Sequence, residues 1–153
     1  MLIFVGVLFF YVTMPHSRSV VKIFSNMSII SSNISKVDNL AICSLNVRGL
    51  SNDVKRRETL NWLRNKKNTV YFLKEVHSSN ETEKLWLAEW GYISLFSSLS
   101  SSRAGVCILF NNNFAFEILK YYSDAEGRFI TADIKTQDKI ITLQSYAPHL
   151  CTE

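Results

Sequence analysis

The sequence predicts an α/β (α+β) fold built on a mixed, largely antiparallel sheet. Three apolar, β-branched runs have the length of buried strands and each ends in polar residues, namely Leu40 to Leu50, Thr69 to Glu75 and Ile140 to Pro148. A helical pattern separates the first two runs. Four strand-like segments then follow one another without an intervening helix, which is typical of antiparallel neighbours.

The polar residues that close these runs form the candidate site. Asn46, Glu75 and Tyr146 each stand at the end of a predicted strand or in the loop after it. In α/β proteins ligands bind at this edge, because side chains from several strands converge there. We therefore expect an amide, a carboxylate and a phenol to meet.

Composition indicates one globular domain with no covalent or metal framework built on cysteine. The chain has 153 residues, of which 47% are hydrophobic and 20% charged. The net charge of +4 permits a polyanionic partner without requiring one. Cys43, Cys107 and Cys151 are odd in number and widely spaced, so neither disulfides nor a zinc site is indicated. An intracellular setting, nucleus or cytoplasm, is the default.

The first 36 residues are interpreted as a poorly ordered leader, followed by one domain over 37–153. Met1 to Thr13 is an apolar run too short for the roughly 20 residues of a membrane-spanning helix, and it lacks the charged start of a secretory signal. A disordered or loosely attached extension is favoured over a signal or anchor. Met14 to Lys36 is rich in Ser and Asn and is interpreted as a linker.

Two helices are expected between the early strands. Ser51, Asn52 and Asp53 offer caps for a helix in which Leu60 and Leu63 face inward. Its outer face is predicted to be basic, carrying Lys55, Arg56, Arg57, Arg64, Lys66 and Lys67; a solvated face is favoured over a phosphate contact. A second helix is expected over Glu81 to Trp90, with Leu85, Trp86 and Trp90 packing in the core rather than stacking on bases.

The later segments are predicted as strands with one apolar face each. In the segment FAFEIL the inward residues are Phe114, Phe116 and Ile118, and in GRFITADI they are Ile130, Ala132 and Ile134. Before them, GYISLF and SRAGVCILF are also predicted as strands, separated by a serine-rich loop over Ser97 to Ser102.

Five segments resemble the endonuclease/exonuclease/phosphatase superfamily in order and spacing. They are LNVRGL, FLKEVH, SRAGVCILF, EGRFI and SYAP, and the resemblance covers about Val37 to Pro148. The nearest likeness is to the apurinic-like endonuclease domain of non-LTR (LINE-type) retrotransposons, which precedes a reverse transcriptase. This resemblance implies the N-terminal half of a four-layer α/β sandwich, with the partner sheet supplied by the second half.

The resemblance also implies roles for the candidate residues in DNA phosphodiester hydrolysis. Such a reaction needs a hard cation, Mg²⁺ or Mn²⁺, to neutralise the phosphate charge. Glu75 matches the family's metal-binding glutamate, Asn46 the asparagine that orients metal or phosphate, and Tyr146 the phosphate-contacting tyrosine. Weaker nucleic-acid-binding candidates are His77, Arg128, His149, Lys55 and Arg56; for Arg128 an ion pair with Asp124 or Glu126 is the simpler expectation.

Three departures from the family pattern bear on activity. Lys74 replaces the usual glutamine before Glu75, and His149 replaces an asparagine after Tyr146-Ala147-Pro148. The family's Gly-Asp-x-Asn and Ser-Asp-His motifs are not found, and catalytic groups of this kind act as a unit. We therefore expect half an active site, inactive alone, whose partners are DNA and the rest of the domain or a reverse transcriptase.

Other functions remain open at this stage. A non-catalytic nucleic-acid-binding remnant, another phosphodiesterase or phosphatase of the superfamily, and a membrane-tethered protein led by Met1 to Thr13 are the alternatives. Among the possible ligands of the superfamily, the EGRFI and SYAP segments favour DNA.

Overall fold

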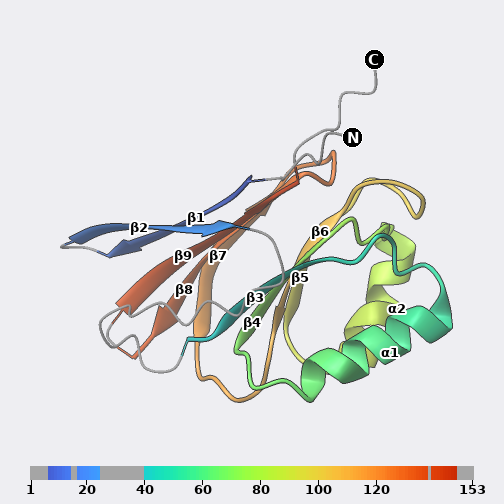
Figure 1. Ribbon diagram of the computed structural model, residues 1–153, viewed down its shortest axis with the longest axis horizontal. Coiled ribbons are helices and arrows are strands. Elements are labelled where there is room, and N and C mark those ends of the chain that lie inside the picture. The colour runs from blue at the N-terminus through green and yellow to red at the C-terminus, as the bar shows by residue number, and fades with distance from the viewer. Residues whose placement is uncertain (1–6, 15–16, 25–39, 138, 148–153) are drawn as a thin grey trace.

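A computed structural model describes residues 7–14, 17–24, 40–137 and 139–147 (Figure 1). This part of the chain forms two helices and nine strands, which are arranged in three sheets. The α+β class predicted from the sequence is confirmed. No helix in these ranges is both long and apolar enough to cross a bilayer.

The first sheet has the strand order β3-β4-β6-β5. Its strands are β3 (Ile42–Asn46), β4 (Val70–Lys74), β5 (Ser94–Ser97) and β6 (Val106–Phe110). Strands β3 and β4 are parallel, and β6 runs antiparallel to both of its neighbours. A parallel pair needs a long crossover, which α1 (Asp53–Arg64) supplies.

Both helices cover the same face of this sheet (Figure 1). Helix α1 begins as predicted, with the Asn52 side chain accepting a hydrogen bond from the Lys55 N–H at 2.9 Å. Helix α2 (Asn80–Trp90) ends at Gly91, whose φ of 79° only glycine adopts cheaply. Trp86 and Trp90 are buried in the core beneath the helices, as predicted.

Two details of the helix prediction were wrong. Leu85 is 50% exposed rather than packed, because the inward stripe of α2 is carried by Trp86 and Trp90. Arg56 is buried at 2% exposure, although we expected it on the outer face of α1. Two carboxylates that meet its guanidinium make this burial possible.

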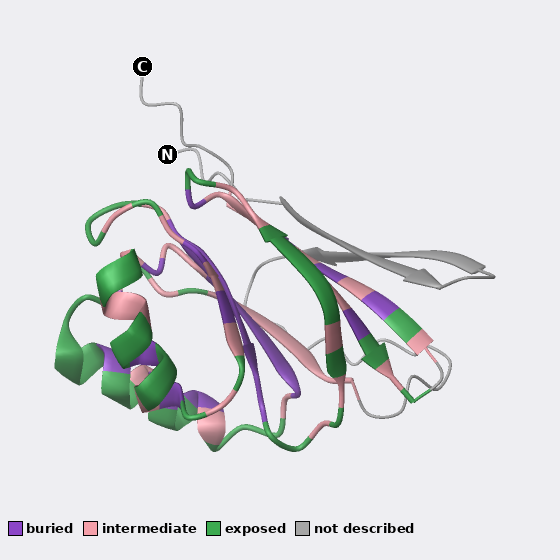
Figure 2. Cartoon of the chain, turned by 180° about the vertical axis from the view of Figure 1, so that it is seen from behind, coloured by how far each residue is buried: buried purple, intermediate pink, exposed green. Residues whose placement is uncertain are grey.

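The second sheet has the order β7-β8-β9 and packs on the first. Its strands are antiparallel and comprise β7 (Glu117–Ser123), β8 (Phe129–Thr136) and β9 (Lys139–Tyr146). Ile130, Ala132 and Ile134 face inward as predicted, and they share one apolar cluster with Phe72 and Ile108 of the first sheet. Figure 2 shows buried residues on the strands of both sheets.

The expectation that the partner sheet comes from a second half of the domain is therefore wrong in part. Strands β7–β9 do not extend the first sheet but cover it, so this chain supplies part of its own partner sheet. Strand β7 also begins later than predicted, because Phe114 and Phe116 precede it and stack on each other, with ring centroids 5.5 Å apart, while packing against the core.

An N-terminal hairpin was not predicted. Strands β1 (Val7–Met14) and β2 (Ser17–Phe24) pair antiparallel where we expected an extension and a linker. Both segments contain β-branched and aromatic residues that favour strands, and the serine content of the second concealed this. The hairpin lies with β1 beside β9 (Figure 1).

Candidate functional site

The ends of β3 and β4 bring Asn46 and Glu75 into direct contact. The two strands are in parallel register, with Asn46 opposite Lys74, so Glu75 follows immediately beyond the pair. The Asn46 Nδ2 donates a hydrogen bond to Glu75 Oε1 at 2.7 Å, and the Asn46 Oδ1 accepts one from the Arg48 N–H at 3.0 Å. The proximity predicted for this pair is confirmed, and among the described residues no hydrogen bond engages the second Glu75 carboxylate oxygen.

Main-chain hydrogen bonds continue the pairing past the strand ends. The Val47 N–H donates to the Lys74 carbonyl at 3.0 Å, and the Gly49 and Leu50 N–H groups donate to the Glu75 and Val76 carbonyls at 2.6 and 2.9 Å. The loop after β3 and the loop after β4 are therefore held side by side. This fixes the backbone on both sides of the carboxylate.

The same pattern of bonds reaches Tyr146. The Val76 N–H donates to the Gly105 carbonyl at 3.1 Å, and the Gly105 N–H donates to the Gly127 carbonyl at 3.0 Å. Next to Gly127, the Arg128 carbonyl accepts from the Ala147 N–H at 2.8 Å. We call this series, from Val47 to Ala147, the strand-end ladder.

The ladder brings Tyr146 to the same end of the sandwich as Asn46 and Glu75. Tyr146 closes β9 and is 50% exposed. Within the described ranges, no hydrogen bond joins its hydroxyl to Asn46 or Glu75. The three predicted residues thus share one edge, and two of them are in contact.

Backbone strain is concentrated in this ladder. Of the five non-glycine residues with positive φ among the described residues, four lie here: Arg48, Glu75, His77 and Ala104, with φ between 47° and 57°. Such conformations cost of the order of 1–3 kcal/mol each, and they gather at functional sites. The strain therefore supports a functional role for this edge on grounds independent of side-chain identity.

His77 packs against the loop that carries Asn46. A Cβ added at Gly49 would lie 2.7 Å from the His77 Nδ1, so only glycine fits beneath the ring. The Ser51 hydroxyl lies 3.1 Å from the His77 carbonyl oxygen. His77 thus holds the loop in place, and a nucleic-acid contact for it stays a prediction.

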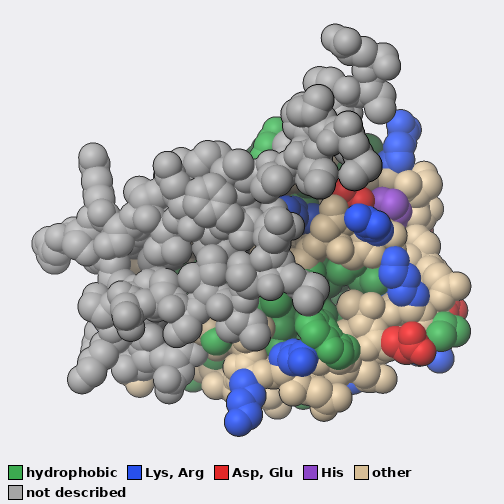
Figure 3. All heavy atoms as spheres, in the orientation of Figure 1, with side chains coloured by type: hydrophobic (Ala, Val, Ile, Leu, Met, Phe, Trp, Pro, Cys, Tyr) green, Lys and Arg blue, Asp and Glu red, His purple; other side chains and the backbone are tan. Residues whose placement is uncertain are grey.

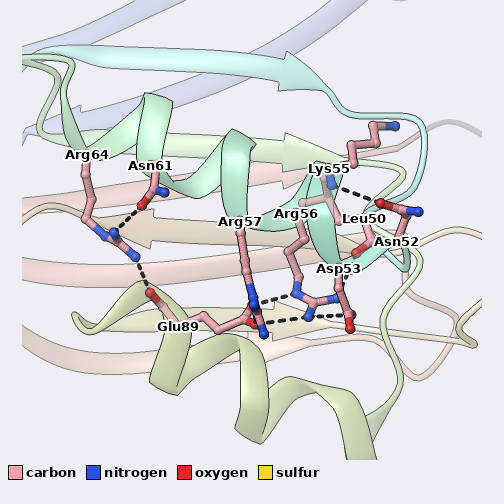
Figure 4. Close-up of polar contacts among 9 residues, drawn as sticks. All are labelled: Leu50, Asn52, Asp53, Lys55, Arg56, Arg57, Asn61, Arg64 and Glu89. Atoms are coloured by element: carbon pink, nitrogen blue, oxygen red, sulfur yellow. Dashed lines mark hydrogen bonds and ion pairs between the residues drawn. The ribbon is translucent and has the colours of Figure 1, made fainter.

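The two basic candidates of α1 both bond other groups of the protein, and Figure 4 shows the contacts of Arg56. Lys55 Nζ donates to the carbonyls of Val47 and Arg48 at 2.8 and 3.1 Å, which ties the helix to the Asn46 loop. Arg56 bonds Glu89 at 2.6 Å and Asp53 at 2.8 Å. Neither side chain is presented as a free cation for phosphate.

The Arg56–Glu89 pair also sets the charge state of its carboxylate. Hydrogen bonding to Arg56 lowers the pKa of Glu89, even though burial opposes ionisation. Arg57 Nε adds a second contact to Glu89 at 3.2 Å. The cluster is thus a structural joint between α1 and α2.

The remaining sequence candidates are placed as follows. Arg128 forms ion pairs with Asp124 at 3.4 Å and Glu126 at 2.8 Å, which is the simpler role expected for it. Burial lowers the pKa of Lys74 beside Glu75. His149 lies outside the described residues.

Two arginines that we did not single out flank the ladder. Arg48 follows Asn46 by two residues, and Arg103 precedes Ala104; both are exposed, and within the described ranges neither has an ion-pair partner. Figure 3 shows basic side chains around the coloured histidine at this end of the molecule. Arg48 lies two residues after Asn46, and Arg103 directly follows the serine-rich loop. These positions were the signal available in the sequence.

The donor set at this edge suits a hard divalent cation. Mg²⁺ is commonly held through one or two carboxylates while it keeps several waters, and Glu75 supplies one half-buried carboxylate whose Oε1 is held by Asn46. Within the described residues, no group of three His, Cys, Asp or Glu side chains comes together. With one carboxylate as ligand, a divalent cation bound here would keep most of its waters or share them with phosphate oxygens.

Comparison with known proteins gives one relationship to a mobile element. No family model matches the chain. Over 110 residues, or 71% of its length, the chain is 32% identical to the "Transposon TX1 uncharacterized 149 kDa protein" of Xenopus laevis. The match points to a transposon-related sequence. The chain spans about 8% of the length of that relative.

Proposed function

We propose that this chain carries the cation- and phosphate-binding part of a divalent-metal-dependent DNA endonuclease site of the retrotransposon type. The observation that supports it most is the 2.7 Å contact between Asn46 Nδ2 and Glu75 Oε1 at the ends of two parallel strands. A half-buried strand-end carboxylate held by an amide is a suitable ligand for Mg²⁺ or Mn²⁺.

Each group at this edge has a distinct task in the proposal. Glu75 binds the cation through its remaining oxygen, and Asn46 is the positioning residue that orients the carboxylate. Tyr146 contacts the scissile phosphate, while Arg48 and Arg103 attract the DNA backbone. When bound, the metal supplies charge neutralisation at the phosphate.

DNA is the favoured substrate for two reasons. The curated relative is a transposon protein, and mobile elements insert into DNA. The five sequence segments that resemble retrotransposon endonucleases also contain Asn46, Glu75, Arg128 and Tyr146.

Water activation requires a further group. Hydrolysis needs a base beside the phosphate, and among the described residues no three His, Cys, Asp or Glu side chains gather into a metal-binding cluster. We therefore propose that the chain by itself binds Mn²⁺ and DNA without cutting the strand.

Binding and cleavage are tested separately. Mn²⁺ binding is followed by electron paramagnetic resonance of the free ion, and binding of a fluorescein-labelled 20-base-pair DNA duplex by anisotropy in Mg²⁺ and in EDTA. The proposal expects Mn²⁺ binding that Glu75→Gln removes, and DNA binding that Mg²⁺ strengthens. Equal Mn²⁺ binding by the wild type and Glu75→Gln would overturn it.

A plasmid assay tests whether the chain binds DNA without cleaving it. Supercoiled plasmid incubated with the chain and Mg²⁺ is expected to stay supercoiled. EDTA-sensitive nicking that Glu75→Gln abolishes would show a complete active site in this chain instead. Binding of DNA that neither EDTA nor Glu75→Gln changes would favour a non-catalytic nucleic-acid-binding protein.

The salt dependence of DNA binding tests the roles of Arg48 and Arg103. Each phosphate contact contributes about one unit to the slope of log affinity against log salt. Arg48→Ala combined with Arg103→Ala should therefore flatten that slope by about two units, whereas Lys55→Ala should leave it unchanged, because Lys55 bonds main-chain carbonyls.

A further inference from the structure

A groove whose lining includes neither Asn46 nor Glu75 lies between α2, β5 and β7. Its volume is about 680 Å³, and its walls come from the first turns of α2, the whole of β5 and the end of β7 with the turn after it. Strand β5 is the last strand of the first sheet and β7 the outer strand of the second. The groove therefore runs along two sheet edges at once.

Within the described ranges, the edge of β5 that faces away from β6 pairs with no other strand. The Phe110 N–H donates to the Ile93 carbonyl, so Ile93 and Phe110 form a hydrogen-bonded pair. Along the antiparallel strands β5 and β6, hydrogen-bonded and non-hydrogen-bonded pairs then alternate. By that alternation, the N–H and C=O groups of Ser94 and Phe96 point away from β6. The Ser94 hydroxyl is also buried without a hydrogen-bond partner within the described part of the chain.

Apolar side chains line the same groove. Tyr121 of β7 is 57% exposed, Leu99 48% and Leu87 of α2 38%. An exposed edge strand next to apolar side chains is the arrangement that accepts an added β-strand, whose main chain pairs with the edge and whose alternate side chains fill pockets.

The charge of the groove selects the kind of peptide. Its charged lining residues are all acidic, namely Glu81, Glu83 and Asp124. Asp124 is paired with Arg128, but within the described ranges no cation pairs with Glu81 or Glu83. In a chain of net charge +4, this local negative field disfavours nucleic acid and attracts a cationic segment.

We propose that this groove, between β5 and β7, binds an extended basic peptide segment of a partner protein, which adds as a strand to the edge of β5. Lysine or arginine side chains of the segment meet Glu81 and Glu83, and its alternate apolar side chains pack against Tyr121 and Leu87. The site is independent of the proposed nuclease chemistry, because it shares no residue with the Asn46–Glu75 pair.

The probe is a fluorescein-labelled decapeptide of alternating lysine and valine, titrated with the full chain and followed by anisotropy. Three comparisons define the site. Glu81→Lys with Glu83→Lys should weaken binding at least tenfold, while the control Glu58→Lys with Glu117→Lys, which changes net charge equally at exposed positions elsewhere, should not. Ser94→Pro should also weaken binding, because it removes an outward N–H without breaking a bond to β6.

A change in the peptide tests strand pairing without altering the protein, so its result does not depend on whether a variant folds. The same decapeptide with N-methyl groups on alternate residues keeps its charge but cannot pair as a strand, and it should lose at least tenfold in affinity. Equal binding of this peptide, or of a glutamate–valine decapeptide, would overturn the proposal. Concentration-dependent dimers in sedimentation velocity that Glu81→Lys with Glu83→Lys dissolves would overturn it in favour of a second copy of the chain.

Discussion

Asn46 and Glu75 are 29 residues apart in the sequence, and their side chains meet at 2.7 Å. The contact exists because α1 returns the chain to form β4 parallel to β3, so both strands end at the same edge. The amide thereby fixes the carboxylate before any ligand arrives.

This relationship predicts a graded effect on cation affinity. Asn46→Ala should weaken Mn²⁺ binding by about tenfold, because loss of an outer-shell partner typically costs 10–100-fold, while Glu75→Gln should abolish it. Asn61→Ala on α1 is the matched control, since the Asn61 side chain accepts a hydrogen bond from Arg64 and is not part of the Asn46–Glu75 contact. Wild-type affinity in Asn46→Ala would show that the amide does not orient the ligand.

Two glycines with similar backbone angles should differ in their tolerance of alanine. Gly49 has φ +80° and would place a Cβ 2.7 Å from His77 Nδ1, whereas Gly91 has φ +79° with nothing within 4 Å. Gly91→Ala should cost about 1 kcal/mol of unfolding free energy in urea, from the backbone alone, and Gly49→Ala distinctly more. Adding His77→Ala to Gly49→Ala should recover the excess; equal losses at both glycines would contradict the contact.

The buried ion pair between the helices should behave differently from an exposed one. Arg56→Ala should lower the unfolding free energy by about 3–5 kcal/mol, because it leaves Glu89 without its main partner. Lys120→Ala, in the exposed pair with Asp133, should cost below about 1 kcal/mol. Urea denaturation of both variants measures the difference, and similar losses would refute the role given to Arg56.

Stability should fall in acid through three carboxylates. The pKa of Glu89 is lowered by the Arg56 hydrogen bond and that of Asp133 by the Thr142 hydroxyl. For Asp124, burial raises the pKa, but hydrogen bonds from Phe129, Ser97 and Arg128 outweigh it and leave the pKa lowered.

The sign follows from linkage. Carboxylates whose pKa is lower in the folded state bind protons more readily when unfolded, so their stabilisation is complete above their ordinary values of 4.5 for Glu and 3.8 for Asp and is lost below them. Urea midpoints should thus be level from pH 7 to about pH 5 and then decline. Glu89→Gln should reduce the decline, and an unchanged slope in that variant would contradict the assignment.

Much of the fold was predictable because local pattern and burial agree. The apolar runs around Phe72 and Ile108 became buried strands, and Asn52 capped α1 as its side chain suggested. The meeting of Asn46 with Glu75 followed from the ends of two neighbouring parallel strands. These features depend on short stretches of sequence and one common topology.

The remaining features depend on distant partners. Periodicity shows which residues of β7–β9 face inward, but it does not specify whether those strands extend the first sheet or cover it. The sequence pattern predicts an exposed Arg56, because it does not show that Glu89, 33 residues later, lies beside the guanidinium. The positive φ of Glu75 and Ala104 is likewise imposed by the strand-end ladder and not by residue type.

The strand-end ladder has a consequence for sequence drift. It joins five segments through amide and carbonyl groups, which every residue except proline provides in the same form. Most loop side chains can therefore change while the framework persists, except at Gly49, Gly105 and Gly127, where an added Cβ would lie less than 3.0 Å from a neighbouring atom. A site geometry that is held by main-chain hydrogen bonds can therefore persist after most of the surrounding residues have been substituted.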